Sequence, residues 1–318
     1  MQIRAVAVPD DLDALGALIA RAETADGHPP IGEHKFLLLF QGDPGHMVGL
    51  VAEEEGKVVA YVALTPNAEP GWWGMEMAVD PDHRSPAAFL TLFEAGTSEV
   101  ARQGGQAVRA WLFQPRLTEV ALRAGFQPER ELLKLERQLP GGFSNAGPGA
   151  VLPNGMRLAS FVPGLDEQVW LDVNNAAFAG HPENGRWTLE VLENRMSQSW
   201  FRAEELLMAW DESSLAGFCW CKRVDGEGEI YVVAVAPKAQ GTGLGRALVL
   251  QGLSMMEREG DRAVFLYVDA ANHRALGLYR SLGFYVDHVD RSFVRFLDDQ
   301  PNRRSQLGQR ESDESVGP

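Results

Sequence analysis

The sequence predicts an α/β protein of two tandem domains, each with a mixed central sheet flanked by helices. Three observations lead to this fold class. A length of 318 residues suits two domains of roughly 150 residues better than one core. Residues 141–155, GGFSNAGPGAVLPNG, have the Gly- and Pro-rich composition of a linker and divide the chain near its middle. Strand and helix patterns follow one another in the same order on both sides of that stretch.

Each half contains a Val-rich strand, a turn with proline, an amphipathic helix, an apolar strand, a second helix and a Gly-Phe pair. The first copy reads EMAVDP, AAFLTLFEAGTSEVARQG, AVRAWLF and LTEVALRAGF. The second reads EIYVVAVAP, GLGRALVLQGLSMMEREG, AVFLYV and HRALGLYRSLGF. Pro81 and Pro237 stand 156 positions apart, and Phe126 and Phe284 stand 158 apart. Equivalent landmarks therefore recur at nearly constant separation, which indicates a duplicated unit.

These landmarks set the predicted boundaries. A degenerate first domain is expected over residues 1–140, a linker over 141–154 and a second domain, expected to be the catalytic one, over 155–297. Residues 298–318, DDQPNRRSQLGQRESDESVGP, have almost no apolar side chains, so burial cannot offset the entropy of ordering them. We expect this tail to be disordered.

The composition is that of a globular protein in water, with 45% hydrophobic and 9% aromatic residues. No apolar run approaches the roughly 20 residues that a membrane span needs. The N-terminus, MQIRAVAVPDDLDAL, lacks the apolar segment of a signal peptide. A cytoplasmic location is therefore expected.

The net charge of −15 and the isoelectric point near 4.9 argue against nucleic acid and membrane surfaces as partners. Such binding depends on Lys and Arg side chains that neutralise phosphates. A polyanionic ligand would have to be held locally, by backbone N–H groups and a few cations. We expect a small-molecule partner and a monomeric chain.

The two cysteines, Cys219 and Cys221, stand in GFCWCK and alternate with Phe218 and Trp220. In a strand this spacing directs both thiols to one face of the sheet. No second Cys or His cluster is evident in the sequence, so we expect buried small side chains and no metal.

The strongest local signal is the run QGTGLGR, residues 240–246, which follows the strand EIYVVAVAP and opens a helix. Glycines let the backbone come close to a ligand, and a helix N-terminus presents free N–H groups and a positive dipole end. This combination indicates a cradle for a pyrophosphate. The run lacks the Lys-Ser/Thr ending of a P-loop, which disfavours nucleotide hydrolysis. On this motif alone, a tight turn without a ligand stays open.

The run resembles the acyl-CoA signature of GNAT acetyltransferases, Q/R-x-x-G-x-G/A, with Gln240, Gly243 and Gly245 at its three positions. Asn272 follows the strand AVFLYV, and Ala275, Tyr279, Gly283 and Phe284 fit that family's A-x-x-x-Y-x-x-x-G-F pattern. The resemblance implies an N-acetyltransferase that uses acetyl-CoA as co-substrate.

Three segments further resemble the mycothiol synthases, two-domain members of that family: NNAAFAGHPENGRWTLEVLENRMSQSWF, LLMAWDESSLAGFCWCK and GEIYVVAVAP. RELLKLERQLP resembles the end of their first half, and the likeness covers about residues 25–296. The resemblance implies acetyl transfer to the cysteinyl amine of a cysteine–glucosamine–inositol conjugate, the last step in making an actinobacterial thiol.

The same resemblance implies the site residues. Acetyl-CoA contacts are expected from Val233, Ala234, Val235, Gln240, Gly241, Thr242, Gly243, Leu244, Gly245, Arg246, Asn272, His273, Arg274, Ala275, Leu276 and Gly277. Acceptor contacts are expected from Glu33, Glu183, Lys222, Glu229 and Tyr267.

Some positions depart from the family pattern. Cys219 and Cys221 stand where His and Thr are usual, Ala234 replaces a Gly, and Ala271 precedes Asn272 where Asp is common. These departures leave the exact acceptor open. Another small amine, a protein N-terminus and a non-catalytic CoA-binding module stay as alternatives.

Two residues are predicted to be catalytic. Period-two alternation places Glu229 on one strand face with Tyr231, Val233 and Val235, where it can act as general base. A cysteinyl amine has a pKa near 7.7–8, so a weak base is enough to remove its proton. The alternative is a solvated glutamate. Tyr279 is the predicted proton donor to the departing CoA thiolate, with simple packing as its alternative.

The remaining acceptor residues have plain alternatives of their own. Lys222 can be an ordinary lysine that ends an apolar strand, and Glu183 and Glu33 can be loop acids.

Direct transfer of the acetyl group is expected, with N–H groups of the strand 233–235 polarising the thioester carbonyl. The first half is expected to bind CoA poorly, because Ala87 and Phe89 replace the glycines of the turn.

Overall fold

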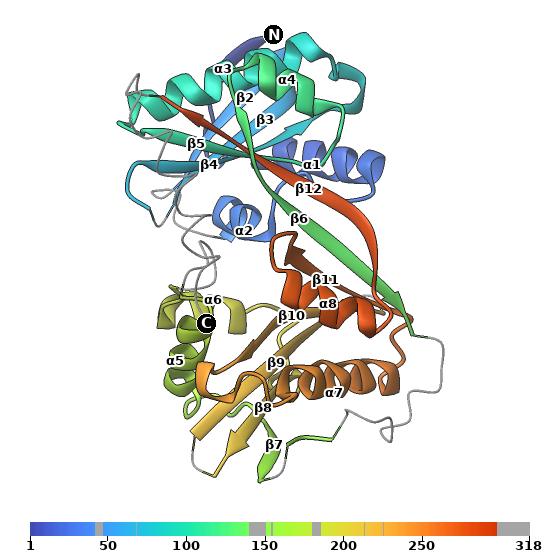
Figure 1. The fold of residues 1–318 in the computed structure, drawn as a ribbon. Coiled ribbons are helices and arrows are strands. Elements are labelled where there is room, and N and C mark those ends of the chain that lie inside the picture. The colour runs from blue at the N-terminus through green and yellow to red at the C-terminus, as the bar shows by residue number, and fades with distance from the viewer. Residues whose placement is uncertain are drawn as a thin grey trace. The chain divides into compact units, whose positions relative to one another are not determined.

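The structure, a computed structural model, describes residues 1–41, 47–67, 69–139, 151–153, 155–179, 186–212, 214–224 and 226–297. These residues form two compact units (Figure 1). Unit 1 contains residues 1–130 and 290–297, and unit 2 contains the described residues between 131 and 289. The predicted tail, 298–318, and most of the predicted linker lie outside the described residues.

Unit 1 has a mixed six-stranded sheet in the order β1-β2-β3-β4-β5-β12, with only β4 and β5 parallel. Its strands are β1 (Gln2–Ala5), β2 (Val48–Glu54), β3 (Lys57–Pro66), β4 (Trp72–Val79), β5 (Ala107–Leu112) and part of β12 (Tyr285–Phe296). Its helices are α1 (Leu12–Asp26), α2 (Glu33–Gln41), η2 (Pro81–His83), α3 (Pro86–Arg102) and α4 (Leu117–Arg123).

Each face of this sheet buries apolar side chains against helices. On one face Phe89, Leu92 and Phe93 of α3 pack against strand residues such as Val62 and Ala110. Leu15, Leu18 and Ile19 of α1, spaced along one side of the helix, pack on the other face. Pro86 at the first helical position and the Ser85 side chain, which accepts a hydrogen bond from Ala88 N, fix the start of α3.

Unit 2 repeats the plan with the order β7-β8-β9-β10-β11-β6, in which only β10 and β11 are parallel. Its strands are part of β6 (Gln127–Gln138), β7 (Met156–Ser160), β8 (Leu206–Asp211), β9 (Ser214–Val224), β10 (Glu227–Val235) and β11 (Ala263–Asp269). Its helices are α5 (Glu167–Ala177), α6 (Leu189–Met196), η3 (Ala203–Glu205), η4 (Pro237–Ala239), α7 (Leu244–Arg258) and α8 (His273–Ser281).

The two faces of the unit 2 sheet differ in character. The α7 face buries Leu248, Leu253 and Met256 of α7 and parts of α8. The α5 face buries an aromatic group in which Trp170 of α5 packs on Phe218 and Trp220 of β9, with ring centroids 4.8 and 5.6 Å apart. The predicted α/β class, with a mixed sheet between helices in each half, is confirmed.

The units do not follow the linear division expected at residues 140 and 155. Residues 132–138 of β6 pair with β11, and Leu133 and Leu135 are buried in the core of unit 2. Residues 291–296 of β12 pair with β5, and Phe293 is buried in the core of unit 1. Each half of the chain thus supplies a strand to the other unit. Composition does not tell which sheet a strand joins.

None of the helices in the described ranges has the length and apolar character that a membrane crossing requires.

Candidate active site

β10 and β11 begin side by side and then diverge. Their parallel register covers only residues 227–229 of β10 and 263–265 of β11. β10 continues to Val235 along β9, while β11 stays paired with β6 through Asp269. In the described chain, the edge of β10 that faces β11 is therefore without a strand partner after Glu229.

A β-bulge at Tyr231 changes the direction of the side chains of β10. Ile230 pairs with Cys221 and Val232 pairs with Trp220, so Tyr231 is the extra residue. Ile230 lies in the core of the α7 face, whereas Tyr231 and Val232 both lie on the α5 face. Beyond the bulge, normal alternation resumes.

The bulge separates Glu229 from the valines. A Cβ on Gly228 would collide with Met256 of α7, so Gly228 faces α7 and Glu229 faces the opposite side. Val233 and Val235 pack on the α7 face. The expectation of one shared face for Glu229, Tyr231 and the two valines is therefore wrong for the valines. One inserted residue reverses the alternation, and nothing in EIYVVAVAP marks it.

The backbone of β10 presents polar groups to its unpaired edge. The N–H of Ala236 donates to Ala216 O at 2.9 Å, which directs its backbone toward β9. Because successive residues of a strand turn their N–H and C=O groups to opposite sides, Val233 and Val235 direct theirs away from β9. The carbonyl of Val235 accepts a hydrogen bond from Gln240 Nε2 at 3.3 Å on that side.

The glycine run at the start of α7 adopts the geometry that a phosphate cradle needs. Gly241 and Gly243 have φ of +81° and +89°, in the left-handed region that favours glycine. A Cβ on either would meet nothing within 4 Å, so the space before the helix is open. Gly243 is the N-cap of α7 and offers no side-chain cap. The first N–H groups of this 15-residue helix are thus available to an anion.

Cationic side chains connect the cradle to α8. Arg274 Nη1 donates to Gln240 Oε1 at 3.2 Å, and Arg246 Nη1 donates to Ser281 Oγ at 2.8 Å. Two guanidinium groups therefore lie beside the cradle, although the whole chain carries a charge of −15. Local cations of this kind are what a polyanionic ligand requires here.

The first turn of α8 is placed beside the cradle, but not all of its side chains are exposed. Asn272 Oδ1 caps the helix by accepting from Ala275 N at 3.0 Å. Leu276 is buried in the core of the α7 face, so it can offer a ligand only its backbone. His273, Arg274 and Gly277 are exposed.

On the α5 face, Glu229 lies in a row of side chains that crosses four strands. Glu229 pairs with Lys222 of β9 on one side and with Phe265 of β11 on the other, and Phe265 pairs with Glu136 of β6. Lys222 Nζ is 3.9 Å from Glu229 Oε2, and both side chains are mostly buried. Tyr267 lies two residues beyond Phe265 and is 43% exposed. Lys222 and Glu229 are thus neighbours, and Tyr267 lies on the same face of the sheet.

The Lys222 ammonium lies beside two aromatic rings, contacts that the sequence motifs did not predict. Its Nζ lies 4.8 Å from the ring centre of Trp200 and 5.5 Å from that of Tyr231. These two rings are themselves 5.1 Å apart. A cation held over aromatic faces is stabilised by their quadrupoles. Phe265 was also missed, because only the strand register shows that it adjoins Glu229.

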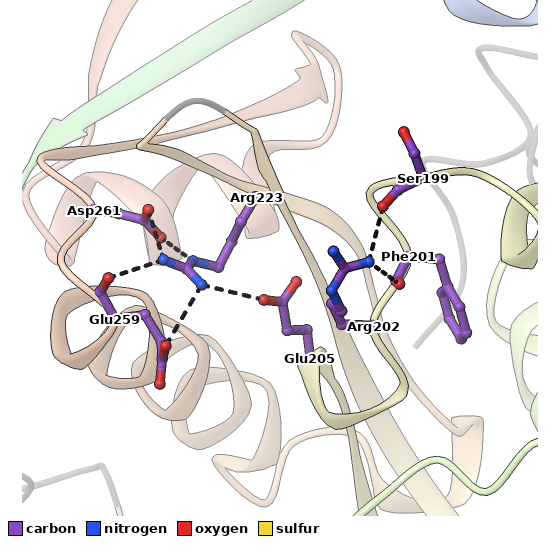
Figure 2. A network of polar contacts seen from close by, with 7 residues as sticks. All are labelled: Ser199, Phe201, Arg202, Glu205, Arg223, Glu259 and Asp261. Atoms are coloured by element: carbon purple, nitrogen blue, oxygen red, sulfur yellow. Dashed lines mark hydrogen bonds and ion pairs between the residues drawn. The ribbon is translucent and has the colours of Figure 1, made fainter.

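A polar network fixes the end of the β9–β10 hairpin next to Lys222 (Figure 2). Arg223 donates to both carboxylate oxygens of the buried Asp261, at 2.5 and 3.0 Å, and to Glu205 at 3.3 Å. Nearby, Arg202 donates to the carbonyls of Ser199 and Phe201 at 2.8 Å each, which holds the turn that carries Trp200. Burial raises the pKa of Glu205, against the opposing effect of Arg223.

Tyr279 lies in α8 and packs in the core of the α7 face, 5.7 Å from Phe284. Burial raises its pKa, as does the nearby Cys219. The phenol is therefore neutral at physiological pH and keeps its proton to donate. It lies on the same side of β10 as Val233 and Val235.

The cysteines are buried on the α7 face, as expected, with their sulfurs 3.8 Å apart under Gly252 of α7. The hydrogen bond to Cys219 and burial raise the pKa of Cys221 well above that of a free thiol. Neither group is a nucleophile in this setting. No cluster of three metal-ligating side chains occurs among the described residues.

Two predicted acceptor residues are not placed. Glu183 lies outside the described residues. Glu33 begins α2 of unit 1, and its side chain also lies outside what the structure describes.

Comparison with known proteins gives consistent matches over both units. The model of the acetyltransferase (GNAT) family matches residues 17–113 and 170–284. A mycothiol acetyltransferase of Kineococcus radiotolerans is 42% identical over 282 residues, covering 87% of this chain and 91% of that protein. One from Thermobispora bispora is 38% identical over 296 residues, covering 90% and 97%.

Solved structures share the whole fold. A GCN5-related N-acetyltransferase from Sphaerobacter thermophilus superposes with a TM-score of 0.72 at 24% identity, covering 93% of this chain and 95% of that one. A tandem GNAT protein from the clavulanic acid biosynthesis pathway gives 0.74 at 15% identity, covering 94% and 99%. At these identities the likeness shows the fold alone.

Proposed function

This chain belongs to the mycothiol acetyltransferases of the GNAT family, and from that premise we propose the reaction that it catalyses. It transfers the acetyl group of acetyl-CoA to the cysteinyl amine of a cysteine–glucosamine–inositol conjugate, the last step of mycothiol biosynthesis. The observation that carries the proposal is the bulge at Tyr231. Because of this bulge, Glu229 lies on one face of β10 and Val233 and Val235 lie on the other, which supports an acceptor on the first side and a donor on the second.

Acetyl-CoA binds on the α7 side in this proposal. Its pyrophosphate meets the N–H groups at the start of α7, with Arg246 and Arg274 beside it. Its pantetheine extends along the unpaired edge of β10. The N–H of Val233 or Val235 then polarises the thioester carbonyl, where negative charge develops as the amine attacks.

The amine approaches from the α5 face, where Glu229 acts as general base. An α-amine has a pKa near 7.7–8, so a carboxylate within reach removes its proton directly or through a water molecule. Lys222, whose Nζ is 3.9 Å from Glu229 Oε2, contacts the acceptor beside the base.

Collapse of the tetrahedral intermediate breaks the C–S bond and releases CoA thiolate. The nitrogen has gained the acetyl group and lost one proton to Glu229. Tyr279, kept neutral by burial, donates a hydrogen bond or its proton to the departing sulfur. No acyl-enzyme is involved, because the buried Cys219 and Cys221 are not nucleophilic.

Acceptor profiling tests the proposal. The full chain is incubated with acetyl-CoA and, in parallel, the conjugate, glucosamine, a polyamine and a peptide with a free N-terminus, and products are identified by mass spectrometry. We expect N-acetylation of the conjugate with one equivalent of free CoA thiol. Preference for another amine would reassign the substrate, and tight CoA binding without thiol release in any arm would indicate a non-catalytic module.

A further inference from the structure

We propose that Lys134, Asp287 and His288, beside Tyr267, form a subsite of unit 2 that binds a polyhydroxylated ring at the far end of the acceptor. This inference rests on the proposed function and names residues that hold the part of the acceptor remote from its amine. None of the three follows from the sequence motifs.

The subsite continues the row that contains Glu229. Lys134 of β6 pairs in register with Tyr267 of β11, and Leu133 and Leu135 on either side of it point into the α7 face. Lys134 and Tyr267 therefore share the α5 face with Glu229. Lys134 Nζ also lies 4.9 Å from the ring centre of Phe265, the residue paired with Glu229.

The polar groups of the subsite are held to one another. Asp287 Oδ2 lies 3.1 Å from Lys134 Nζ and 3.2 Å from His288 Nδ1. The His288 ring meets the Tyr267 ring edge-on, with centroids 6.5 Å apart. Burial raises the pKa of Asp287, but the hydrogen bonds from Lys134 and His288 outweigh it and hold the pKa below its usual value. The carboxylate is thus ionised at neutral pH.

The distance from Glu229 suits an extended acceptor. Neighbouring strands lie about 4.8 Å apart, so β6 is two spacings, or about 10 Å, from β10. An acceptor whose amine meets Glu229 and which lies across the strands would place its first ring over Phe265 and Tyr267. A second ring would reach Lys134.

The chemistry of the three side chains fits vicinal hydroxyl groups. A carboxylate accepts two hydrogen bonds, an ammonium donates three, and an imidazole supplies either role. Lys134, Asp287 and His288 are 22%, 37% and 27% exposed, so each is anchored yet accessible. The exposed ring of Tyr267 offers an apolar surface for the C–H face of a sugar. A ring with adjacent hydroxyls and no net charge matches this set.

Two acceptors tested with two variants examine the subsite. Asp287→Asn and Lys134→Met are assayed with the complete conjugate and with cysteinyl-glucosamine, which lacks the inositol. We expect KM for the complete conjugate to rise about 10-fold in each variant, as for the loss of a hydrogen bond to a charged group. KM for the truncated acceptor, kcat and KM for acetyl-CoA should stay unchanged. Asp211→Asn, an exposed carboxylate at the end of β8, is the matched control.

An equal change of KM for both acceptors, or none for either, would overturn the inference. A binding measurement separates it from the proposed function. Calorimetric titration with glucosaminyl-inositol, which cannot be acetylated at a cysteinyl amine, should give weaker binding to Asp287→Asn than to the parent chain. This loss would support the subsite even if the conjugate were not turned over, and unchanged binding would count against it.

Discussion

The two units share one topology but differ at the turn between the central strand and its helix. In unit 2, Gly243 precedes α7 without a side-chain cap, and the N–H groups of the first turn stay available. In unit 1 the equivalent helix, α3, starts earlier, at Pro86, and the side chain of Ser85 caps its first turn. The duplicated fold therefore leaves the start of this helix without a side-chain cap in unit 2, where we propose that the pyrophosphate binds, and caps it in unit 1.

Arg84, the first residue of this turn in unit 1, is held by an ion pair within the unit. Arg84 stands 156 positions before Gln240, and its Nε donates to Val79 O at 3.0 Å, as Gln240 does to Val235 O. Arg84 is also bound to both oxygens of Asp26, at 2.6 and 2.8 Å. Asp26 thus pairs with the guanidinium group of Arg84, which an anionic ligand would otherwise need.

The central strands differ as well. β10 carries a bulge at Tyr231, whereas the pairs of β3 with β4 are in regular register from Ala60 to Pro66. Trp73 pairs with Val108 under α3 as Gly228 pairs with Val264 under α7, so the position equivalent to Glu229 is Gly74. Unit 1 thus has no side chain where unit 2 places a carboxylate, which supports the prediction that only unit 2 is catalytic.

The largest expected effect tests the base in unit 2. Glu229→Gln should lower turnover by about 10²–10⁴, because a positioned general base is lost, and leave acetyl-CoA affinity nearly unchanged. The defect should shrink as pH rises through the amine pKa of about 8. Turnover of mutant and parent is measured from about pH 6.5 to 9 around that value. Glu227→Gln, two residues earlier and exposed, is the control, and equal rates for all three proteins would remove Glu229 from the mechanism.

Breaking the Arg84–Asp26 ion pair of unit 1 should lower the stability of the fold and leave turnover unchanged. Asp26→Ala leaves the mostly buried Arg84 without its carboxylate partner and should lower the free energy of unfolding by about 3 kcal/mol. Urea denaturation measures this loss, and turnover per folded molecule should not change. Arg102→Ala breaks a pair in which the arginine is 70% exposed and should cost less than about 1 kcal/mol. A comparable loss of unfolding free energy in both variants would contradict a special stabilising role of the Arg84–Asp26 pair.

Removal of the phenol in unit 2 should slow release of CoA. Tyr279→Phe keeps the ring that packs on Phe284 and should lower kcat about 100-fold. Because burial raises the pKa of Tyr279, the parent should show no fall in kcat from this group below about pH 10. The neutral Tyr279 phenol stabilises the folded chain fully below its unfolded pKa of about 10. This contribution is lost as the pH rises through the higher pKa of the folded chain. A parent-like kcat in the mutant would leave Tyr279 with packing alone.

The smallest effect is expected at the thiols. An aromatic disulfide reagent should leave Cys219 and Cys221 unmodified in the native chain, because both are buried and the pKa of Cys221 is raised. Turnover should be unaffected, and both thiols should react once the chain is denatured. Absorbance of the released thiol measures the reaction. Rapid native modification with loss of turnover would contradict the burial of the pair.

Local sequence signals predicted the elements that depend on local chemistry. The glycines of the cradle, the Val-rich strand and the face shared by the two cysteines follow from dihedral preferences and alternation. The bulge at Tyr231 did not, because an extra strand residue is set by pairing with β9. The exchange of β6 and β12 was also missed, since strands whose paired residues are 125 or more positions apart leave no local signal. Trp200 and Phe265 became visible as site neighbours only through tertiary contacts.

The number of acetyl-CoA molecules bound per chain tests the difference between the units most directly. Calorimetric titration of the full chain should give one site. Gly243→Glu should abolish it, because a side chain and a negative charge enter the left-handed turn where we propose that the pyrophosphate binds. Thermal melting checks that the mutant is folded. Ala87→Glu, the same change at the equivalent exposed position of unit 1, should leave binding unchanged. Two sites in the parent chain, or retained binding in Gly243→Glu, would contradict the assignment of the acyl donor to unit 2.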